Sequence, residues 1–209
     1  MKKIYLILIV LITLSCKAQT PIIPIYDNGG IFGEQQNAYY KDVEGYFNQF
    51  VGTWLFTNGT KVLKVTFVKK ERMLMENSYY VDFLVGEFQY IENGVEKANT
   101  LSNLIINYNN AFNYNLYSLV RIRKTSYPRC EECETDEKRL EMKFTEPAND
   151  DALLEAAFIM RRVIENGTEK LKVKFMMTSG ACGLKPNSQE ASTATIHSIP
   201  YGEYTLIKQ

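Results

Sequence analysis

Four cysteines and a single histidine are the residues of this chain whose types could support metal or redox chemistry. Cys130 and Cys133 form a Cys-x-x-Cys motif, and Glu131 and Glu132 separate them. Nearby carboxylates raise the pKa of a thiol and so disfavour the reactive thiolate. We therefore expect a structural disulfide, either between Cys130 and Cys133 or from Cys182 to one of them.

A zinc site is the alternative for the same part of the chain. Cys130, Cys133, Cys182 and His197 could together supply three sulfur ligands and one nitrogen ligand. The second pair lacks the close spacing of a zinc motif, and an oxidising compartment favours disulfides. We expect no metal at this position.

The sequence contains no strong catalytic motif. His197 follows a serine- and threonine-rich segment, residues 188–195, that we expect to be a loop. A serine hydrolase would need a nucleophile on a strained turn, and the Gly-x-Ser-x-Gly pattern is absent, as are glycine-rich phosphate loops. We therefore expect a protein that is not an enzyme and that has neither catalytic residues nor a cofactor.

The first residues predict export from the cytoplasm. Lys2 and Lys3 precede an apolar run at residues 4–14, which is shorter than the roughly 20 residues that a membrane-spanning helix needs. We interpret residues 1–15 as a signal peptide, which is removed from the mature protein.

Two processing routes compete at the end of this signal. Leu14-Ser15-Cys16 resembles a bacterial lipobox, and the resemblance implies that Cys16 becomes the first mature residue and carries lipid. The protein would then be anchored to a membrane of the cell envelope, and we expect the outer membrane. Cleavage near Ala18, which would give a secreted or periplasmic protein, is the alternative.

Charge and composition exclude one class of partner. The chain has 24 basic and 24 acidic residues, and the basic residues are dispersed rather than clustered. Because binding to phosphate backbones needs clustered Lys and Arg, we expect no nucleic-acid partner. The 14 tyrosines and 11 phenylalanines favour strands over helices.

The mature chain divides into a connecting segment and one domain. Residues 16–38 contain prolines and glycines that disfavour regular structure, and we interpret them as a tether. The spacing of aromatic residues over residues 39–50 predicts one short amphipathic helix, which ends before Gly52. Residues 39–209 are expected to form a single domain of ordinary size.

From residue 54 onward, apolar and polar residues alternate with period two, as in strands that bury one face. Three Asn-Gly pairs, at residues 58–59, 93–94 and 166–167, predict tight hairpins. The pattern therefore predicts a mainly β fold, an antiparallel up-and-down barrel of about eight to nine strands. A β-sandwich is the alternative.

Two positions in this pattern are irregular. Gly86 interrupts a long strand-like segment, and we expect it to mark a bulge or bend. Residues 150–157 have the acidic start and the helix propensity of a first helical turn, so we expect a short helix that leads into the next strand.

Gly52-Thr53-Trp54 resembles the Gly-x-Trp motif of lipocalins and other calycin-like barrels. In those folds the tryptophan packs under the closed end of the barrel against an arginine of the last strand. The resemblance implies that Gly52 and Trp54 form a structural barrel floor, although Lys208 stands here where an arginine would be expected. The chain also resembles an uncharacterised family, a domain of unknown function, of small exported Bacteroidota lipoproteins.

Amide and aromatic side chains alternate at residues 107–117. Tyr108, Asn110, Tyr114 and Tyr117 are of types that stack on sugars and bond to their hydroxyl groups, so this stretch is a candidate binding loop. The alternative is a connection whose tyrosines pack on the barrel wall and whose asparagines form turns.

These observations lead to two functional expectations. The first is an envelope-anchored, non-catalytic protein that binds an apolar or amphipathic small molecule within the barrel. The second is a surface interaction or structural protein whose exposed loops contact a glycan or another protein. A cavity with convergent polar groups would favour the first, and an interior filled by side chains would favour the second.

Overall fold

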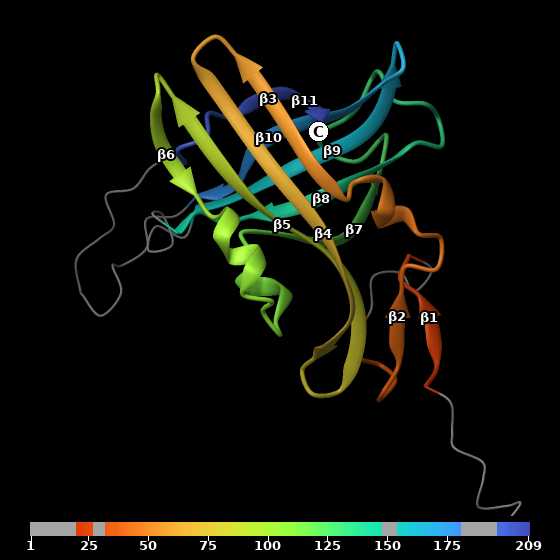
Figure 1. The fold of residues 1–209 in the computed structure, drawn as a ribbon. Coiled ribbons are helices and arrows are strands. Elements are labelled where there is room, and N and C mark those ends of the chain that lie inside the picture. Colours follow the sequence, from red (N-terminus) through yellow and green to blue (C-terminus); the bar gives the residue numbers. More distant parts are fainter. Residues whose placement is uncertain (1–19, 27–31, 148–153, 181–195) are drawn as a thin grey trace, which may run out of the picture.

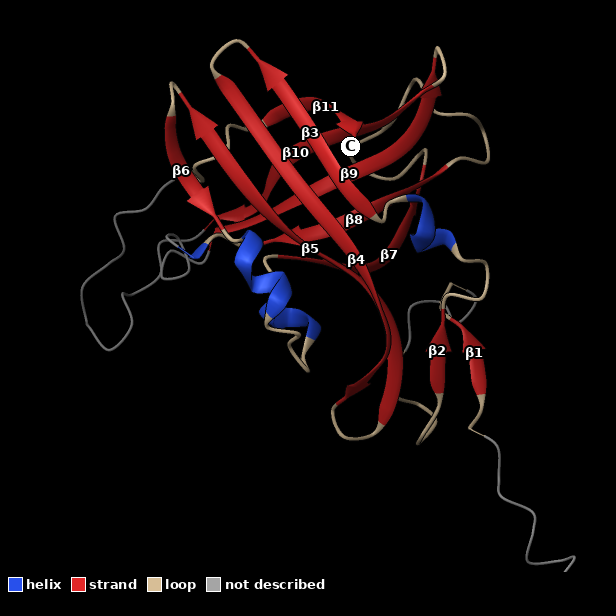
Figure 2. Ribbon diagram, viewed as in Figure 1, coloured by secondary structure: helices blue, strands red, loops and turns tan. Residues whose placement is uncertain are grey.

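The structure is a computed structural model that describes residues 20–26, 32–147, 154–180 and 196–209 (Figure 1). It is mainly β, with short 3-10 turns between some of the strands (Figure 2). The strands are β1 (Ile22–Pro24), β2 (Tyr39–Lys41), β3 (Gly52–Asn58), β4 (Lys61–Met75), β5 (Tyr79–Glu92), β6 (Val95–Asn99), β7 (Leu116–Arg123), β8 (Lys138–Phe144), β9 (Leu154–Glu165), β10 (Thr168–Gly180) and β11 (Gly202–Lys208). The 3-10 turns are η1 (Tyr46–Gln49), η2 (Leu101–Ile105) and η3 (Ala111–Asn113). No helix within the described ranges has the length and apolar character needed to cross a membrane.

Eight strands close into an antiparallel barrel. Neighbours pair in the order β5-β4-β3-β11-β10-β9-β8-β7, and β7 returns to β5 through Leu84↔Ser118 and Gly86↔Leu116. The same edge of β5 also pairs with β2 on one side of β7 and with β6 on the other. The predicted barrel is confirmed, and the closed order of its strands excludes the β-sandwich that was the alternative.

The Asn-Gly pairs form hairpin turns, with one displacement. Asn93-Gly94 joins β5 to β6 and Asn166-Gly167 joins β9 to β10, and all four residues have positive φ, as a type I′ turn requires. In the first hairpin, Asn58 pairs with Lys61 in the ladder, so the loop residues are Gly59-Thr60. That turn lies one residue later than predicted.

Aromatic side chains occupy the inside of the barrel. Phe88, Phe144, Phe158 and Phe175 come from four different strands, and each is at most 1% exposed. The ring centres in contact lie between 4.8 and 5.4 Å apart. Rings from these four strands meet because the sheet is closed around them, and their packing supplies much of the hydrophobic core.

Gly86 lies in a regular part of the ladder, opposite Phe67, so the predicted bulge at this residue is wrong. A Cβ atom at residue 86 would lie 2.5 Å from Cδ1 of Phe67. Glycine is needed here because the Phe67 ring packs directly against the backbone of β5. The irregularity in this strand pair lies instead between Lys70 and Met73 of β4.

The helix predicted over residues 39–50 is wrong in its first part. Tyr39–Lys41 form β2, and only Tyr46–Gln49 form a helical turn. The physical reason is Asp42, whose buried carboxylate accepts hydrogen bonds from the backbone N–H groups of Tyr46 and Phe47. The turn therefore starts after Asp42, and the residues before it pair in parallel with β1 and β5.

The short helix predicted over residues 150–157 is wrong for the part that the structure describes. Residues 154–157 begin β9, which pairs with both β8 and β10, and residues 150–153 lie outside the described residues. Ala156 and Ala157 are completely buried. Pairing on both edges of β9 overrides the local helix propensity.

Trp54 packs where the first and last barrel strands meet. It is completely buried, and its indole N–H donates to the carbonyl oxygen of Phe50 at 2.7 Å. Lys208 is its ladder partner in β11, with Nζ 5.5 Å from the centre of the Trp54 ring. Gly52 has a φ of +121°, which favours glycine. Lys208 thus contacts the Trp54 ring from the last strand of the barrel.

Candidate functional site

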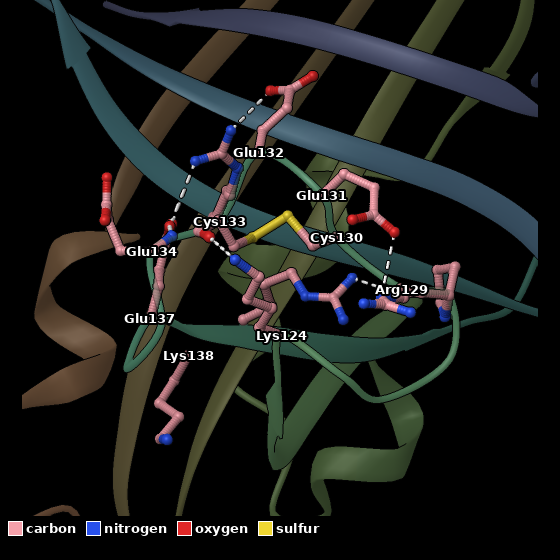
Figure 3. Close-up of a disulfide and its surroundings, with 12 residues drawn as sticks. Lys124, Arg129, Cys130, Glu131, Glu132, Cys133, Glu134, Glu137 and Lys138 are labelled. Atoms are coloured by element: carbon pink, nitrogen blue, oxygen red, sulfur yellow. Dashed lines mark hydrogen bonds and ion pairs between the residues drawn. A yellow bond between two sulfur atoms is a disulfide. The ribbon is translucent and has the colours of Figure 1, made fainter.

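The connection between β7 and β8, residues 124–137, carries the Cys-x-x-Cys motif. Cys130 and Cys133 form a disulfide (Figure 3), which decides between the pairings that the sequence left open. The ammonium group of Lys124 donates to the carbonyl oxygen of Cys133 at 2.6 Å and holds this disulfide loop in place. Cys182 and Cys16 lie outside the described residues.

Arg139, at the start of β8, fixes the connection to the barrel. Its buried guanidinium donates to the carbonyl oxygens of Arg123, Ser126 and Pro128 at 2.6–3.0 Å. Burial, together with the positive charge of Arg161, lowers the pKa of this guanidinium. A buried cation whose hydrogen bonds go to neutral carbonyl groups adds positive potential to the surface beside it.

An open cleft of about 320 Å³ lies beside this arginine. The disulfide loop forms one wall, and residues of β9, β10 and β11 form the other. Five of its lining residues are cationic and three are anionic. The lining residues are Arg129, Cys130, Glu131, Glu132, Arg139, Ile159, Arg161, Lys172, Val173, Lys174, Glu203, Tyr204 and Thr205.

Two adjacent cations form part of the sheet wall of the cleft. Arg161 of β9 and Lys172 of β10 are direct partners in the ladder, where like charges repel each other. Glu132 and Glu137 approach Arg161 to 2.8 and 3.3 Å, and Glu165 approaches Lys172 to 3.3 Å. Two carboxylates of the connection, those of Glu132 and Glu137, therefore lie where a bound anion would meet Arg161.

Weaker ion pairs surround the opening of the cleft. Arg129 and Glu131 lie 3.1 Å apart, and Lys174 and Glu203 lie 3.9 Å apart, with all four side chains largely exposed. Exposed ion pairs of this kind contribute little to stability. A charged ligand can therefore replace one partner of such a pair at little cost.

The residues of the zinc alternative do not come together in the described part of the chain. Cys130 and Cys133 are joined to each other, and no group of three or more His, Cys, Asp and Glu residues within the described ranges could hold a metal ion. His197 is buried, its ring centre lies 5.2 Å from that of Phe144, and its Nδ1 lies 2.7 Å from the Tyr201 hydroxyl oxygen. Burial lowers the pKa of His197, which favours the neutral imidazole.

Part of the candidate binding loop packs against the barrel. Tyr114 is buried, and its ring centre lies 5.1 Å from that of Tyr108. The Asn110 side chain accepts a hydrogen bond from the N–H of Phe112 and caps η3. Tyr117 belongs to β7 and is half-buried. The loop presents Phe112, rather than the predicted tyrosines, as its exposed aromatic side chain.

The family described as a family of unknown function, DUF6705, matches residues 1–209. The chain belongs to this family. The resemblance to an uncharacterised family is thereby confirmed. No curated protein and no solved structure matches the chain significantly.

Arg161 and Lys172 were not singled out by the sequence analysis, although the sequence contains a signal for their pairing. Asn166-Gly167 is a two-residue turn, and such a turn fixes the register of the strands on either side. Counting outward from it places residue 161 opposite residue 172. Nothing in the sequence indicated that Arg139 and the disulfide loop lie beside these two side chains. Their proximity depends on the closed barrel, which brings distant parts of the chain together.

Proposed function

We propose that this protein is a non-catalytic binding protein of the cell envelope, anchored by lipid on Cys16, which holds an acidic glycan in the cleft beside the disulfide loop. The observation that carries this proposal is the adjacent pair Arg161 and Lys172 in a cleft of about 320 Å³. A cleft of this size suits a small saccharide segment.

The lining contains both cationic and anionic side chains, which supports a carboxylate-bearing glycan as the ligand. Arginine and lysine side chains would bind the carboxylates of the ligand, with Arg161 exchanging its contact with Glu132 for a bidentate pair with the ligand. Glu131, Glu132 and Glu203 would accept hydrogen bonds from sugar hydroxyls. A single-stranded nucleic acid fits less well, because Tyr204, the aromatic residue of this lining, is buried and offers no exposed face for base stacking.

The packing of the barrel supports a site on its outer surface. An apolar ligand inside would have to displace the contacting rings of Phe88, Phe144, Phe158 and Phe175. Displacing packed core side chains is costly, so the geometry favours the second of the two functional expectations over the first. In this proposal the barrel is a rigid scaffold for the cleft.

Calorimetric titration of the purified protein tests the proposal. A short uronic-acid oligosaccharide should bind, with an affinity that falls as salt concentration rises, whereas a neutral oligosaccharide of equal length should not. The double variant Lys172→Gln/Lys174→Gln should bind at least about tenfold more weakly, which corresponds to about 1.4 kcal/mol. Lys97→Gln, which removes an exposed cation of β6, is the matched control. Equal binding of the neutral sugar, or unchanged binding by the double variant, would contradict the proposal.

A further inference from the structure

The length of chain between Cys16 and the first strand limits how the molecule can lie on a membrane. Thr20, the first described residue, follows Cys16 by four residues. Fully extended chain spans at most about 3.6 Å per residue, so a lipid on Cys16 would hold Thr20 within about 15 Å of the bilayer. The end of the fold that contains β1 must then face the membrane closely.

β1 is fixed to the rest of the fold through β2. Its ladder with β2 includes Ile22↔Tyr39, and the N–H of Tyr39 also donates to the carbonyl oxygen of Pro21 at 2.7 Å. The hydroxyl of Tyr39 donates to the buried Asp82 carboxylate of β5 at 2.6 Å. The N-terminal strand therefore has one orientation relative to the long β4–β5 hairpin, beside which it lies in Figure 1.

The 3-10 turn η2 and the loop after it lie along the same hairpin. The Lys70 ammonium group donates to the side-chain oxygen of Asn107 at 2.7 Å, and the Phe112 ring centre lies 6.1 Å from that of Phe83. Figure 1 shows η2, the tip of the β4–β5 hairpin and β1 at the same end of the molecule, below the barrel in this view. The turn between β5 and β6 lies at the opposite end, and β6 runs from this turn toward η2.

Four exposed aliphatic residues belong to the segments at this lower end. Ile105 and Ile106 are adjacent at the end of η2 and are 86% and 56% exposed. Leu74 near the hairpin tip and Ile22 of β1 are exposed as well. Aliphatic groups at this position can enter the boundary between lipid headgroups and acyl chains, where burying their CH₂ groups is favourable.

We infer that this end of the molecule docks on a lipid bilayer, with Ile105 and Ile106 inserted at the headgroup boundary. The inference rests on one part of the proposed function, the lipid on Cys16, and is independent of the glycan cleft. The bilayer is the partner because the short connection to Cys16 brings this surface to the membrane. A second point of attachment would hold the barrel in one orientation instead of letting it rotate on its tether.

Quenching by brominated lipids tests the orientation in the full chain. The protein is produced with its own signal and is reconstituted in vesicles of brominated phosphatidylethanolamine and phosphatidylglycerol. Ile105→Trp reports on the proposed membrane face, and Val95→Trp, at an exposed position of β6, reports on the opposite end. The native Trp54 is completely buried and supplies a constant background. Both substitutions are at exposed positions, and equal melting temperatures would verify that both variants fold.

The expected result is at least a twofold loss of the added emission for Ile105→Trp and no loss for Val95→Trp. The mass of the Cys16 peptide is measured on the same samples. Acylated Cys16 with equal quenching at both positions, or with none at either, would overturn the docked orientation and leave the anchor intact. An unmodified Cys16 would overturn the anchor and, with it, the docked orientation. The glycan titration tests the cleft independently of both.

Discussion

The ammonium group of Lys208 lies 5.5 Å from the centre of the Trp54 ring, at the seam where the last strand of the barrel meets the first. The ladder at this seam is short, with Ile207↔Leu55 and Lys208↔Trp54 as its paired positions. Lys208 also pairs with Glu169 of β10 at 2.9 Å. One lysine therefore links the side chains of three strands where the barrel closes.

Removing the charge of Lys208 should weaken this seam. Lys208→Met keeps the apolar stem but loses both the cation–π contact and the ion pair with Glu169, so the free energy of unfolding should fall by about 0.5–1 kcal/mol. Lys208→Arg should be close to neutral, because a guanidinium can stack on the indole ring. Urea unfolding measures both, and an arginine variant that loses as much stability as the methionine variant would contradict this account.

Gly86→Ala should destabilise the barrel. The new Cβ atom would lie 2.5 Å from Cδ1 of Phe67, so either the ring or the strand must move. Overpacking of this kind costs about 1–3 kcal/mol. Gly94→Asn is the matched control, because Asn tolerates the positive φ of that turn and nothing lies near its Cβ position. Equal thermal stability of the two variants would refute the close approach of Phe67.

Glu87 should make stability depend on pH. Its side chain is buried in β5, and burial raises its pKa from 4.5 to about 7, against the opposing hydrogen bonds of Thr100 and Asn115. Because the folded state holds this proton more tightly than the unfolded state, Glu87 lowers the free energy of unfolding as pH rises from about 4.5 to 7. Above that range the loss is complete.

Glu87→Gln should therefore be more stable than the native protein at pH 8, by about 1–3 kcal/mol, and similar to it near pH 4.5. Denaturant unfolding at several pH values gives the difference between the two proteins. Glu96→Gln, at an exposed position of β6, serves as the control and should show no such trend. A Glu87→Gln difference that stays constant with pH would rule out titration of this carboxyl group.

Loss of the disulfide should affect the cleft more than the barrel. Cys130 and Cys133 close a very short loop, so the chain-entropy estimate for opening it is only about 2 kcal/mol. Cys130→Ser/Cys133→Ser should thus remain folded but bind the uronic-acid oligosaccharide several-fold more weakly. The loop that forms one wall of the cleft would lose its cross-link and would no longer be held in one conformation. Treatment of the native protein with a thiol reductant should give the same titration. Undiminished binding would show that the loop wall is not needed.

Cys16→Ser should release the protein from the membrane. The lipid on Cys16 is the proposed attachment to the membrane. The exposed aliphatic side chains of the proposed docking surface, such as Ile105 and Ile106, are too few to hold the protein there by themselves. After cell disruption and ultracentrifugation, the native chain should sediment with the membrane fraction and the variant should stay in the supernatant. Lys17→Ser leaves Cys16 in place and should sediment as the native chain does. Sedimentation of Cys16→Ser would contradict the anchor.

The sequence determined the barrel because its signals are local. Asn93-Gly94 and Asn166-Gly167 specify hairpin turns, and the alternation of Leu171, Val173 and Phe175 with lysines specifies one buried face. Antiparallel strands joined by such turns pair with their neighbours in the chain, so the fold class follows from short-range information.

Tertiary structure decided the features that depend on distant partners. Tyr39–Lys41 form a strand because they pair with β1 and β5. Tyr114 is buried because it packs against the barrel wall. The cleft exists because Arg139 holds the disulfide loop over Arg161. Local propensities differ by less than the free energy of burying a side chain or completing a ladder, so these long-range contacts prevailed over the local pattern.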